Sequence, residues 1–314
     1  MNKVTMKDIA EAAKVSLATV SYVLNNNTKQ KISEETRQRI LAIAQQLQYV
    51  PNMAARSLVG NTSSKLVAIV TLKDNDDQPW RKSRYHDLTM RLQELLNERG
   101  YDVIVAVTDT AQVELDIILK RTLDALFLID VPEERFFNIS RKFTVPIIVI
   151  DSYIEDTMFR KVVPDYRSAI RLAREMLGGR LEPFLVTGKF NNSGMEQTLT
   201  ETFRPDHVYQ MDTRKGLEQY VLARPGLPGI FANELLAVMA APYMRAEDMI
   251  VLANAGAEYL LPSGVRRIVF DNGVKAQMSI AVMEKLLRKE YDEIEDYSYV
   301  PPDERIHQRI DTRE

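Results

Sequence analysis

Short apolar runs alternate with longer amphipathic stretches through most of the chain, from residue 65 to residue 289. Runs such as Lys65–Val70, Ala125–Ile129 and Pro146–Ile150 have the length and composition of buried strands, and the stretches between them have the apolar spacing of helices. Parallel strands need a crossover connection, and a helix is the usual one. The alternation therefore predicts an α/β fold, a doubly wound parallel sheet with helices on both faces.

The predicted elements form two successive series. The first has strands at 65–70, 101–107, 125–129 and 146–150 and helices at 85–99, 113–121 and 133–142. The second has strands at 183–187, 207–211, 228–232, 248–252 and 266–270 and helices at 165–177, 193–203, 213–223, 233–244 and 272–289. Two such series predict a bilobed binding domain over 64–314, with ligands near the carboxyl ends of the strands. We expect lobe 1 at about 64–162 plus a return segment after 271, and lobe 2 at about 163–270.

Residues 1–50 follow a different pattern, that of short helices. Thr5 followed by MKDIAEAA, with Asp8 three positions on, predicts a first helix with a capping box. Ser16 is expected to cap a second helix, and the tight turn at Lys14-Val15 joins the two into a helix-turn-helix. The inner face of the second helix is expected to hold Leu17, Val20, Val23 and Leu24.

A third helix is predicted to begin at Ser33, where Glu34 and Glu35 suit the positive end of the helix dipole. It extends to about Gln48, and Pro51 ends it because proline cannot donate the next hydrogen bond. Its expected buried residues are Ile40, Ile43, Ala44 and Leu47.

The segment 51–63 is predicted to form a hinge helix and a linker. A helical stretch over Asn52–Val59 ends at Gly60, and Asn-Thr-Ser-Ser follows as a flexible joint. Two turns of helix are unstable alone, but two copies packed together on DNA could wedge Leu58 between base pairs in the minor groove. The alternative is an ordinary linker, with Leu58 packed on the body.

The charge of the chain is divided unevenly between its two parts. Residues 1–63 hold eight Lys and Arg against four acids, a net charge of +4, whereas the remainder carries −7. A basic head on an acidic body predicts that the head meets a polyanion such as DNA.

The second helix carries side chains suited to such a contact. Leu17, Ala18, Ser21 and Tyr22 are expected to face outward at its N-terminal end, which is the end that a recognition helix inserts into the major groove. Thr19, Ser21 and Asn25 suit phosphate contacts, which position the head without reading the sequence. Tyr22, Leu17 and Ala18 are the candidate base readers. The alternative is a small three-helix bundle without a DNA partner.

Residues 3–60 resemble the headpiece of the lactose-repressor (LacI/GalR) family, through VTMKDIAEAAKVSLATVSYVLN and ISEETRQRILAIAQQLQYVPNMAARSL. The resemblance implies phosphate contacts by Thr5, Ser16, Thr19, Ser21, Asn25 and Tyr49. It also implies an operator preference set by Leu17, Ala18 and Tyr22, and a minor-groove hinge helix containing Asn52, Ala55 and Leu58. Tyr22 replaces the Arg that is common in the family, so we expect a different base preference there.

The body resembles the effector domain of the same family, which is similar to periplasmic sugar-binding proteins. GIFANELLAVMAAPYM and RRIVFDNGVKAQMSIAVMEKLL carry this resemblance, which implies a carbohydrate-related effector. The segment TGKFNNSGMEQTLTETF, however, lacks the Arg with which the family usually clamps sugar hydroxyls. Leu252-Ala253-Asn254-Ala255-Gly256 likewise replaces the usual Gly-Phe-Asp-Asp. The departures argue against a standard pyranose bound in the usual way.

Candidate effector contacts follow the predicted strands. Trp80, Arg81, Arg84 and Tyr85 come after the first strand, and their aromatic faces and positive charge suit a ring with a phosphate or a carboxylate. The alternative is a mobile polar loop with Trp80 at the dimer surface. Polar groups are expected near other strand ends, where each also fits a helix cap: Asp151, Asn191, Asn233, Asn254 and Asp271.

Other classes of site find little support in the sequence. The chain has no cysteine and three histidines, so we expect no disulfide, no metal site and no cofactor. No apolar run reaches the length of a membrane helix, and the first residues lack a signal-peptide core, so we expect a cytoplasmic protein without a membrane partner.

We interpret the chain as a dimeric DNA-binding transcriptional regulator, a repressor rather than an enzyme. Two heads would read a roughly palindromic double-stranded operator, because two-fold symmetry in the protein requires it in the DNA. A small-molecule effector in the cleft would be coupled reciprocally to DNA binding. One alternative is a cytoplasmic solute-binding or sensor module, against which the missing signal peptide argues. The other is an enzyme, against which the absence of a paired nucleophile and base argues.

Overall fold

The computed structural model describes residues 6–24, 32–47, 63–73, 85–109, 115–178, 181–291 and 294–304. The chain forms two compact units, Met1–Thr62 and Ser63–Glu314, which we call the head and the body. Within the described ranges, no helix combines the length and the apolar character needed to cross a membrane.

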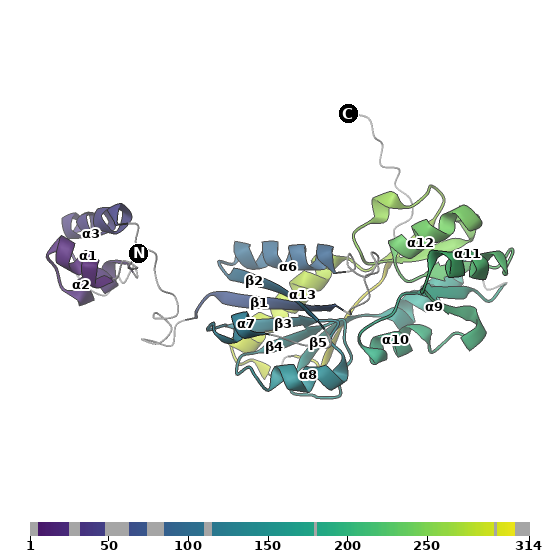
Figure 1. The fold of residues 1–314 in the computed structure, drawn as a ribbon, viewed down its shortest axis with the longest axis horizontal. Coiled ribbons are helices and arrows are strands. Elements are labelled where there is room, and N and C mark those ends of the chain that lie inside the picture. The colour runs from purple at the N-terminus through teal and green to yellow at the C-terminus, as the bar shows by residue number, and fades with distance from the viewer. Residues whose placement is uncertain are drawn as a thin grey trace, which may run out of the picture. The chain divides into compact units, whose positions relative to one another are not determined.

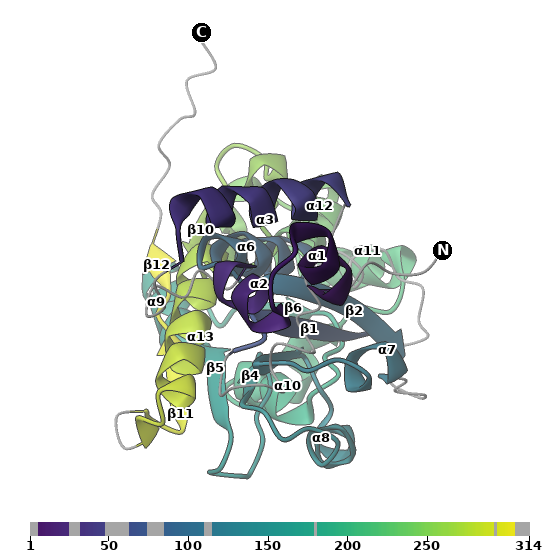
Figure 2. The same ribbon diagram turned by 90° about the vertical axis from the view of Figure 1, so that its left-hand side faces the viewer.

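The described part of the head consists of the helices α1 (Met6–Ala13), α2 (Leu17–Leu24) and α3 (Glu34–Gln46), drawn in purple in Figure 1. Figure 2 shows α3 lying across α1 and α2. The hydroxyls of Ser16 and Ser33 cap α2 and α3 by accepting hydrogen bonds from the backbone N–H groups of Thr19 at 3.1 Å and Thr36 at 3.3 Å. Lys14, with φ of 54°, makes the turn between α1 and α2.

One apolar core joins the three helices of the head. Its buried members are Ile9, Ala10, Ala13, Val20, Val23, Ile40 and Ala44. In α3 the predicted inner residues Ile43 and Leu47 are half-buried and pack against this core. The prediction of Leu17 on the inner face of α2 was wrong, because its side chain is 51% exposed in the first turn, where the core contacts of the helix have not yet begun.

The first lobe of the body is built on a parallel six-stranded sheet with the order β11-β5-β4-β3-β1-β2. Its strands are β1 (Leu66–Lys73), β2 (Asp102–Asp109), β3 (Ala125–Ile129), β4 (Ile147–Ile150), β5 (Arg160–Pro164) and β11 (Tyr297–Val300). Its helices are α6 (His86–Glu98), α7 (Asp116–Leu119), α8 (Glu133–Ser140) and α13 (Asn272–Leu287). Helix α13 lies against α6 and along β4, β5 and β11 (Figures 1 and 2).

The central strands β3 and β4 are apolar throughout, and β1 is apolar over most of its length, because helices cover both faces of the sheet there. Val67 and Ile69 of β1 share a buried cluster with the Leu residues of α6, whereas Ala68 and Val70 share another with residues of α7 and α8. Successive side chains of a strand point to opposite faces, so a continuous apolar run serves two helical layers.

The second lobe has a six-stranded sheet with the order β12-β10-β9-β8-β6-β7, parallel except for β12, which is antiparallel to β10. Its strands are β6 (Phe184–Thr187), β7 (Val208–Gln210), β8 (Gly229–Phe231), β9 (Met249–Ala253), β10 (Arg266–Val269) and β12 (Asp303–Glu304). Its helices are α9 (Tyr166–Met176), α10 (Ser193–Thr200), α11 (Arg214–Leu222) and α12 (Glu234–Ala240). Short 3-10 helices cover Pro205–His207, Ala241–Tyr243, Ala246–Asp248 and Glu258–Leu260.

The predicted α/β class and its two successive series of strands and helices are confirmed, with three kinds of difference. Helix α7 covers only Asp116–Leu119 of the predicted 113–121, whose first two residues lie outside the described ranges. The predicted helix 233–244 ends as α-helix at Ala240 and continues as a 3-10 turn. The strands β5, β11 and β12 were not predicted.

The described chain crosses between the lobes after β5, after β10 and after β11. The crossings, together with the hydrogen bonds that join the lobes, bring the carboxyl ends of strands from both sheets to one junction. This junction is where a doubly wound fold places ligands.

Candidate functional site

The N-terminal end of α2 presents small and apolar side chains to solvent. Ser16, Leu17 and Ala18 are exposed, and Thr19 and Tyr22 are half-buried. The Ser16 hydroxyl caps the helix and lies 2.8 Å from the Thr19 hydroxyl. A leucine that is 51% exposed at a helix end suits an apolar contact, for example with a thymine methyl group in the major groove.

The described head thus brings together five of the predicted DNA contacts, Ser16, Leu17, Ala18, Thr19 and Tyr22, on α2 and its cap. The other predicted DNA contacts lie outside the described residues: Thr5, Asn25, Tyr49, Asn52, Ala55 and Leu58. The side chain of Ser21 also lies outside the described part of the structure. Among the predicted effector contacts, Trp80, Arg81 and Arg84 also lie outside the described residues.

In the body, a buried ion pair occupies the carboxyl end of β4. Asp151 is 5% exposed and Lys275, in the first turn of α13, is 2% exposed. The Lys275 Nζ atom lies 2.9 Å from each carboxylate oxygen of Asp151. Asp151 and Asp130, at the ends of neighbouring strands, both take left-handed backbone conformations with φ of 52°. Such strain in non-glycine residues concentrates at functional sites.

Asn191 and Asn192, which follow β6 in the second lobe, reach across to the first lobe. The Asp130 carboxylate accepts hydrogen bonds from both of their backbone N–H groups, at 3.1 and 3.3 Å. The Asn191 side chain donates to the Leu72 carbonyl at 2.9 Å. The Asn192 side chain, fully buried, donates to the carbonyls of Val131 and Tyr153 and accepts from the Tyr153 N–H. This segment therefore holds the two lobes together.

Burial raises the pKa of the Tyr153 hydroxyl beside this bridge. Its ring stacks on Tyr297, with centroids 5.3 Å apart, and burial raises the pKa of Tyr297 to about 12. Both phenols are therefore neutral near pH 7, and the Tyr297 hydroxyl donates to the Ile154 carbonyl at 3.0 Å.

A second bridge joins α6, the loop after β9 and the start of α13. The Asn272 side-chain amide donates to Asp87 at 2.9 Å and to the Asn254 carbonyl at 3.0 Å. Glu234, fully buried, accepts hydrogen bonds from three backbone N–H groups of the same loop, those of residues 254, 255 and 257. Gly256 has φ of +70°, and an added Cβ there would lie 2.7 Å from the Asp87 Cγ, so the close approach of the loop to α6 requires glycine.

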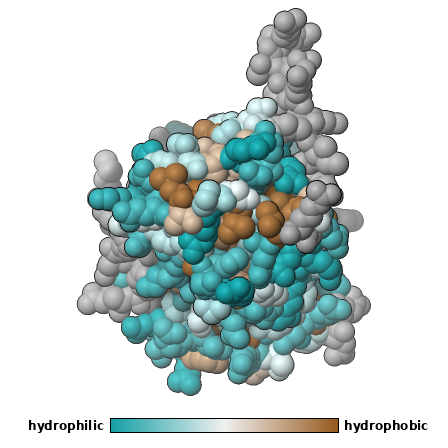
Figure 3. Space-filling model, turned by 90° about the vertical axis from the view of Figure 1, so that its right-hand side faces the viewer, coloured by the Kyte–Doolittle hydropathy of each residue, from teal (hydrophilic) through white to brown (hydrophobic). Residues whose placement is uncertain are grey.

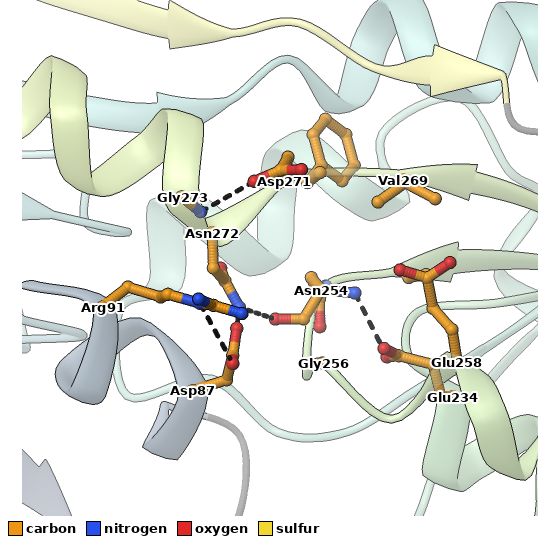
Figure 4. Close-up of a pocket in the computed structure, with 12 residues that line it drawn as sticks. Asp87, Arg91, Glu234, Asn254, Gly256, Glu258, Val269, Asp271, Asn272 and Gly273 are labelled. Carbon is orange, nitrogen blue, oxygen red and sulfur yellow. Dashed lines mark hydrogen bonds and ion pairs between the residues drawn. The ribbon is translucent and has the colours of Figure 1, made fainter.

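Two cavities border these bridges. The smaller holds about 10 Å³ and is lined by Tyr85, Asp151, Tyr166, Phe190, Ala232, Asn254 and Asn272. The larger holds about 400 Å³ and is lined by Asp87, Arg91, Glu234, Ala253, Asn254, Gly256, Glu258, Val269, Phe270, Asp271, Asn272 and Gly273. Figure 4 shows Asp87, Arg91, Asn272 and Asn254 converging in the larger one.

The structure places the remaining predicted effector residues in different roles. Tyr85, Asp151 and Asn254 line the smaller cavity, and Asn254 and Asp271 line the larger. Asn233 caps α12 by accepting from the Leu236 N–H at 2.9 Å, as the helix-cap alternative predicted. Asp271 likewise caps α13.

Sequence reasoning missed four residues that build this junction: Asp87, Asn192, Asn272 and Lys275. The available signal was that Lys275 shares one face of its helix with the apolar residues Val282 and Leu286, because a buried ammonium group requires a carboxylate partner. Nothing in the sequence pointed to Asp87, since an acid in the first turn of a helix is ordinary.

The fold and the junction define a class of protein, a helix-turn-helix head joined to a bilobed α/β body of the periplasmic-binding-protein type. Residues 5–52 match the model of the lacI family of bacterial regulatory proteins. Over its head the chain is therefore similar to bacterial regulatory proteins of the lacI family.

Individual relatives extend the similarity into the body. The chain is 30% identical to the fructose operon regulatory protein of Vibrio cholerae over 182 residues, 55% of this chain and 53% of that protein. It is 25% identical to catabolite control protein A of Staphylococcus xylosus, over 92% of this chain and 88% of that protein. A lac repressor dimer bound to operator and an anti-inducer shares the fold, with a TM-score of 0.71, 17% identity and coverage of 96% and 97% of the two chains. The matches to the first relatives span 53% to 65% of the lengths of those proteins.

Proposed function

We propose that the chain is a sequence-specific DNA-binding transcriptional regulator, a repressor that binds a palindromic operator as a dimer. The observation that carries the proposal is the exposed N-terminal end of α2, with Leu17 and Ala18 presented on a rigid helix that Ser16 caps. A recognition helix requires this geometry. The family match covers the same residues.

The residues of the head divide by role in this proposal. Leu17, Ala18 and Tyr22 read bases, and the phosphate contacts come from Thr5, Ser16, Thr19, Ser21, Asn25 and Tyr49. Residues 1–50 form the DNA-binding domain, 51–63 the hinge with Asn52, Ala55 and Leu58, and 64–314 the effector-binding and dimerisation domain. The site of action is the cytoplasm, where the operator DNA lies.

Dimerisation is supported by apolar side chains on an open sheet edge. Strand β2 ends the sheet of the first lobe, and its Val105 and Val107 are 41% and 61% exposed. An exposed apolar edge strand is a template for pairing with another chain. The second lobe also exposes apolar residues, including Leu181, Leu222 and Leu260, and Figure 3 shows such residues gathered on one of its faces. A second copy of the chain would cover part of this surface.

A small-molecule effector at the junction of the lobes would control DNA binding. Relatives named for fructose, sucrose and ribose operons support a carbohydrate-related effector. A ligand that contacts both lobes favours one relative arrangement of them, and this preference is coupled to DNA affinity.

The test is a titration of the full chain into fluorescent duplexes that tile the DNA upstream of its own coding region. We expect one duplex to bind far more tightly than a scrambled duplex of equal composition, with an affinity that falls steeply as salt increases. Leu58→Ala should weaken binding to that duplex more than binding to the scrambled one. Equal losses on both duplexes would refute the wedging of Leu58.

A further inference from the structure

The first residues of the body are tied to a single carboxylate. Asp124 directly precedes β3, and its Oδ1 accepts hydrogen bonds from the backbone N–H and the hydroxyl of Ser64, at 2.7 and 2.8 Å. Its Oδ2 accepts from the Lys65 N–H at 3.1 Å and from the Ser63 hydroxyl. Three successive residues therefore donate to one side chain, and we call this arrangement the Asp124 clip.

The backbone inside the clip is held in an unusual conformation. Lys65 has a φ of 55°, in the left-handed region that non-glycine residues seldom adopt. Its carbonyl accepts from the Asp102 N–H at 2.7 Å, and the Asp124 N–H donates to the Leu66 carbonyl at 2.8 Å. The Lys65 ammonium group lies 4.2 Å from the centroid of the Tyr101 ring. Such a conformation persists only where its surroundings over-determine it, so the direction of the chain at Lys65 is fixed.

The clip lies at one end of the first-lobe sheet and the junction of the lobes lies at the other. Leu66, Asp102 and Ala125 begin β1, β2 and β3, and β1 is hydrogen-bonded to β2 on one side and to β3 on the other. The junction, by contrast, is built where these strands end, at Leu72 and Asp130. The eight residues of β1 separate the two ends by about 23 Å, at about 3.3 Å per residue. One hydrogen-bonded sheet therefore connects the clip to the junction.

The position of the clip in the chain suggests its role. Ser63 is the first residue of the body, and the head precedes it in the sequence. The clip therefore sets the point from which the chain leaves the sheet toward the head. Phosphate contacts made by one head do not depend on such a point. Binding of two heads to half-sites at a fixed spacing does depend on it.

We propose that Asp124 is a positioning residue for specific DNA binding, which anchors the segment carrying the head to the first lobe. The proposal rests on the proposed regulatory function and names the point through which the body holds each head. In a dimer, the separation of the two clips limits the half-site spacing that the pair of heads can reach. A loosened clip lengthens the free tether and lowers the effective concentration of the second head at its half-site.

The test compares Asp124→Asn with the original full chain by anisotropy titration on the operator duplex and on a scrambled duplex of equal composition. The change keeps the shape of the side chain but turns an amide NH₂ group toward donors that an oxygen now accepts. Binding to the operator should weaken about tenfold, as the loss of hydrogen bonds to a charged group implies. Binding to the scrambled duplex, which depends on phosphate contacts, should stay within about twofold.

The matched control is Asp102→Asn, on the neighbouring strand. Its exposed side chain makes no hydrogen bond or ion pair among the described residues, so this variant should bind both duplexes like the original chain. Ser64→Ala removes one hydroxyl of the clip and serves if Asp124→Asn does not fold. It should lower the ratio of operator to scrambled affinity about threefold, as the loss of one hydrogen bond implies.

A merely structural role of Asp124 predicts a different result. If the carboxylate only stabilised the sheet, Asp124→Asn would lower the melting temperature. The ratio of operator to scrambled affinity would then stay unchanged at temperatures where the variant is folded. An unchanged ratio in folded Asp124→Asn, or in Ser64→Ala, would overturn the proposal.

Two outcomes separate this proposal from the proposed function. If the original chain prefers the operator and Asp124→Asn keeps that preference, only the anchoring role is rejected. If the original chain prefers no duplex, the regulator is rejected and the anchoring role with it. Amide hydrogen exchange on the same preparations should be faster at Ser64 and Lys65 in Asp124→Asn, because both N–H groups lose their acceptor. Unchanged exchange at these two amides would also overturn the proposal.

Discussion

The ammonium group of Lys275 lies 2.9 Å from both carboxylate oxygens of Asp151, and both side chains are almost fully buried. The pair ties the first turn of α13 to the end of β4, beside the point where the chain returns from the second lobe. The Asp151 carboxylate at the junction of the lobes is therefore already engaged by the Lys275 ammonium group.

Removing one partner of this pair should cost much more than removing both. Lys275→Met leaves a buried carboxylate alone and should lower the free energy of unfolding by about 3–5 kcal/mol. Combining it with Asp151→Leu removes both charges and should restore most of that loss. Urea denaturation followed by circular dichroism measures both values. A matched control is Glu284→Gln, which breaks the half-exposed pair with Arg99 and should cost less than about 1 kcal/mol. If Lys275→Met lowered the free energy of unfolding no more than Glu284→Gln does, the buried pair would not be structurally important.

Asn192→Ala should loosen the junction of the lobes. The side chain is fully buried and bridges Val131 and Tyr153, so its loss leaves buried backbone groups unpaired at a cost of about 1–3 kcal/mol. Amide hydrogen exchange should speed up at Tyr153 and its neighbours. Asn191→Ala is the control, because among the described residues that half-buried side chain makes one hydrogen bond, to the Leu72 carbonyl. Unchanged exchange at Tyr153 in Asn192→Ala would contradict the bridging role.

Leu17→Ala should impair DNA recognition without unfolding the head. Half of this side chain is exposed, so its truncation removes little core contact, and the preference for the operator over scrambled DNA should fall about tenfold, as expected for about 1–3 kcal/mol of discrimination. Anisotropy titrations and thermal melts measure the two effects. Val20→Ala, at a fully buried position of the same helix, should instead lower the melting temperature. A Leu17→Ala variant with intact operator preference would exclude Leu17 as a base reader.

Val107→Lys should weaken the dimer if β2 forms the interface. Burying an unpaired ammonium group at an edge strand is costly, so sedimentation should reveal monomer at concentrations where the original chain is dimeric. The control is Met158→Lys, because Met158 is 81% exposed and lies outside the strands. If both variants sediment as dimers, β2 is not part of the interface.

The elements that the sequence predicted are those whose residues carry their own signal. Strands such as β3 and β4 are continuous apolar runs, and α2 and α3 have capping serines at the expected positions. Strand β5 could not be predicted, because its Lys161 looks like a surface residue. It is buried only through contacts to the carbonyls of Asp156 and Phe159 and to Asp296, which is distant in the sequence.

The candidate site in the body was predictable only in part for the same reason. Asp151 and Asn254 follow apolar runs, and parallel strands bring such positions to one edge. The partners that decide their chemistry, Lys275 and Asn272, come from a helix that returns from the other lobe. Lys275 and Asn272 are far in the sequence from the residues that they contact, so the sequence pattern does not predict these contacts. The contacts form because α13 packs on α6 and β4.

The two heads of a dimer are expected to read a two-fold symmetric DNA site. Selection of bound duplexes from a random-sequence pool by the purified full chain, at moderate salt, tests this directly. We predict that the recovered sequences converge on two inverted half-sites with a fixed spacing. Recovered sequences without enrichment, or with a single half-site, would contradict the account.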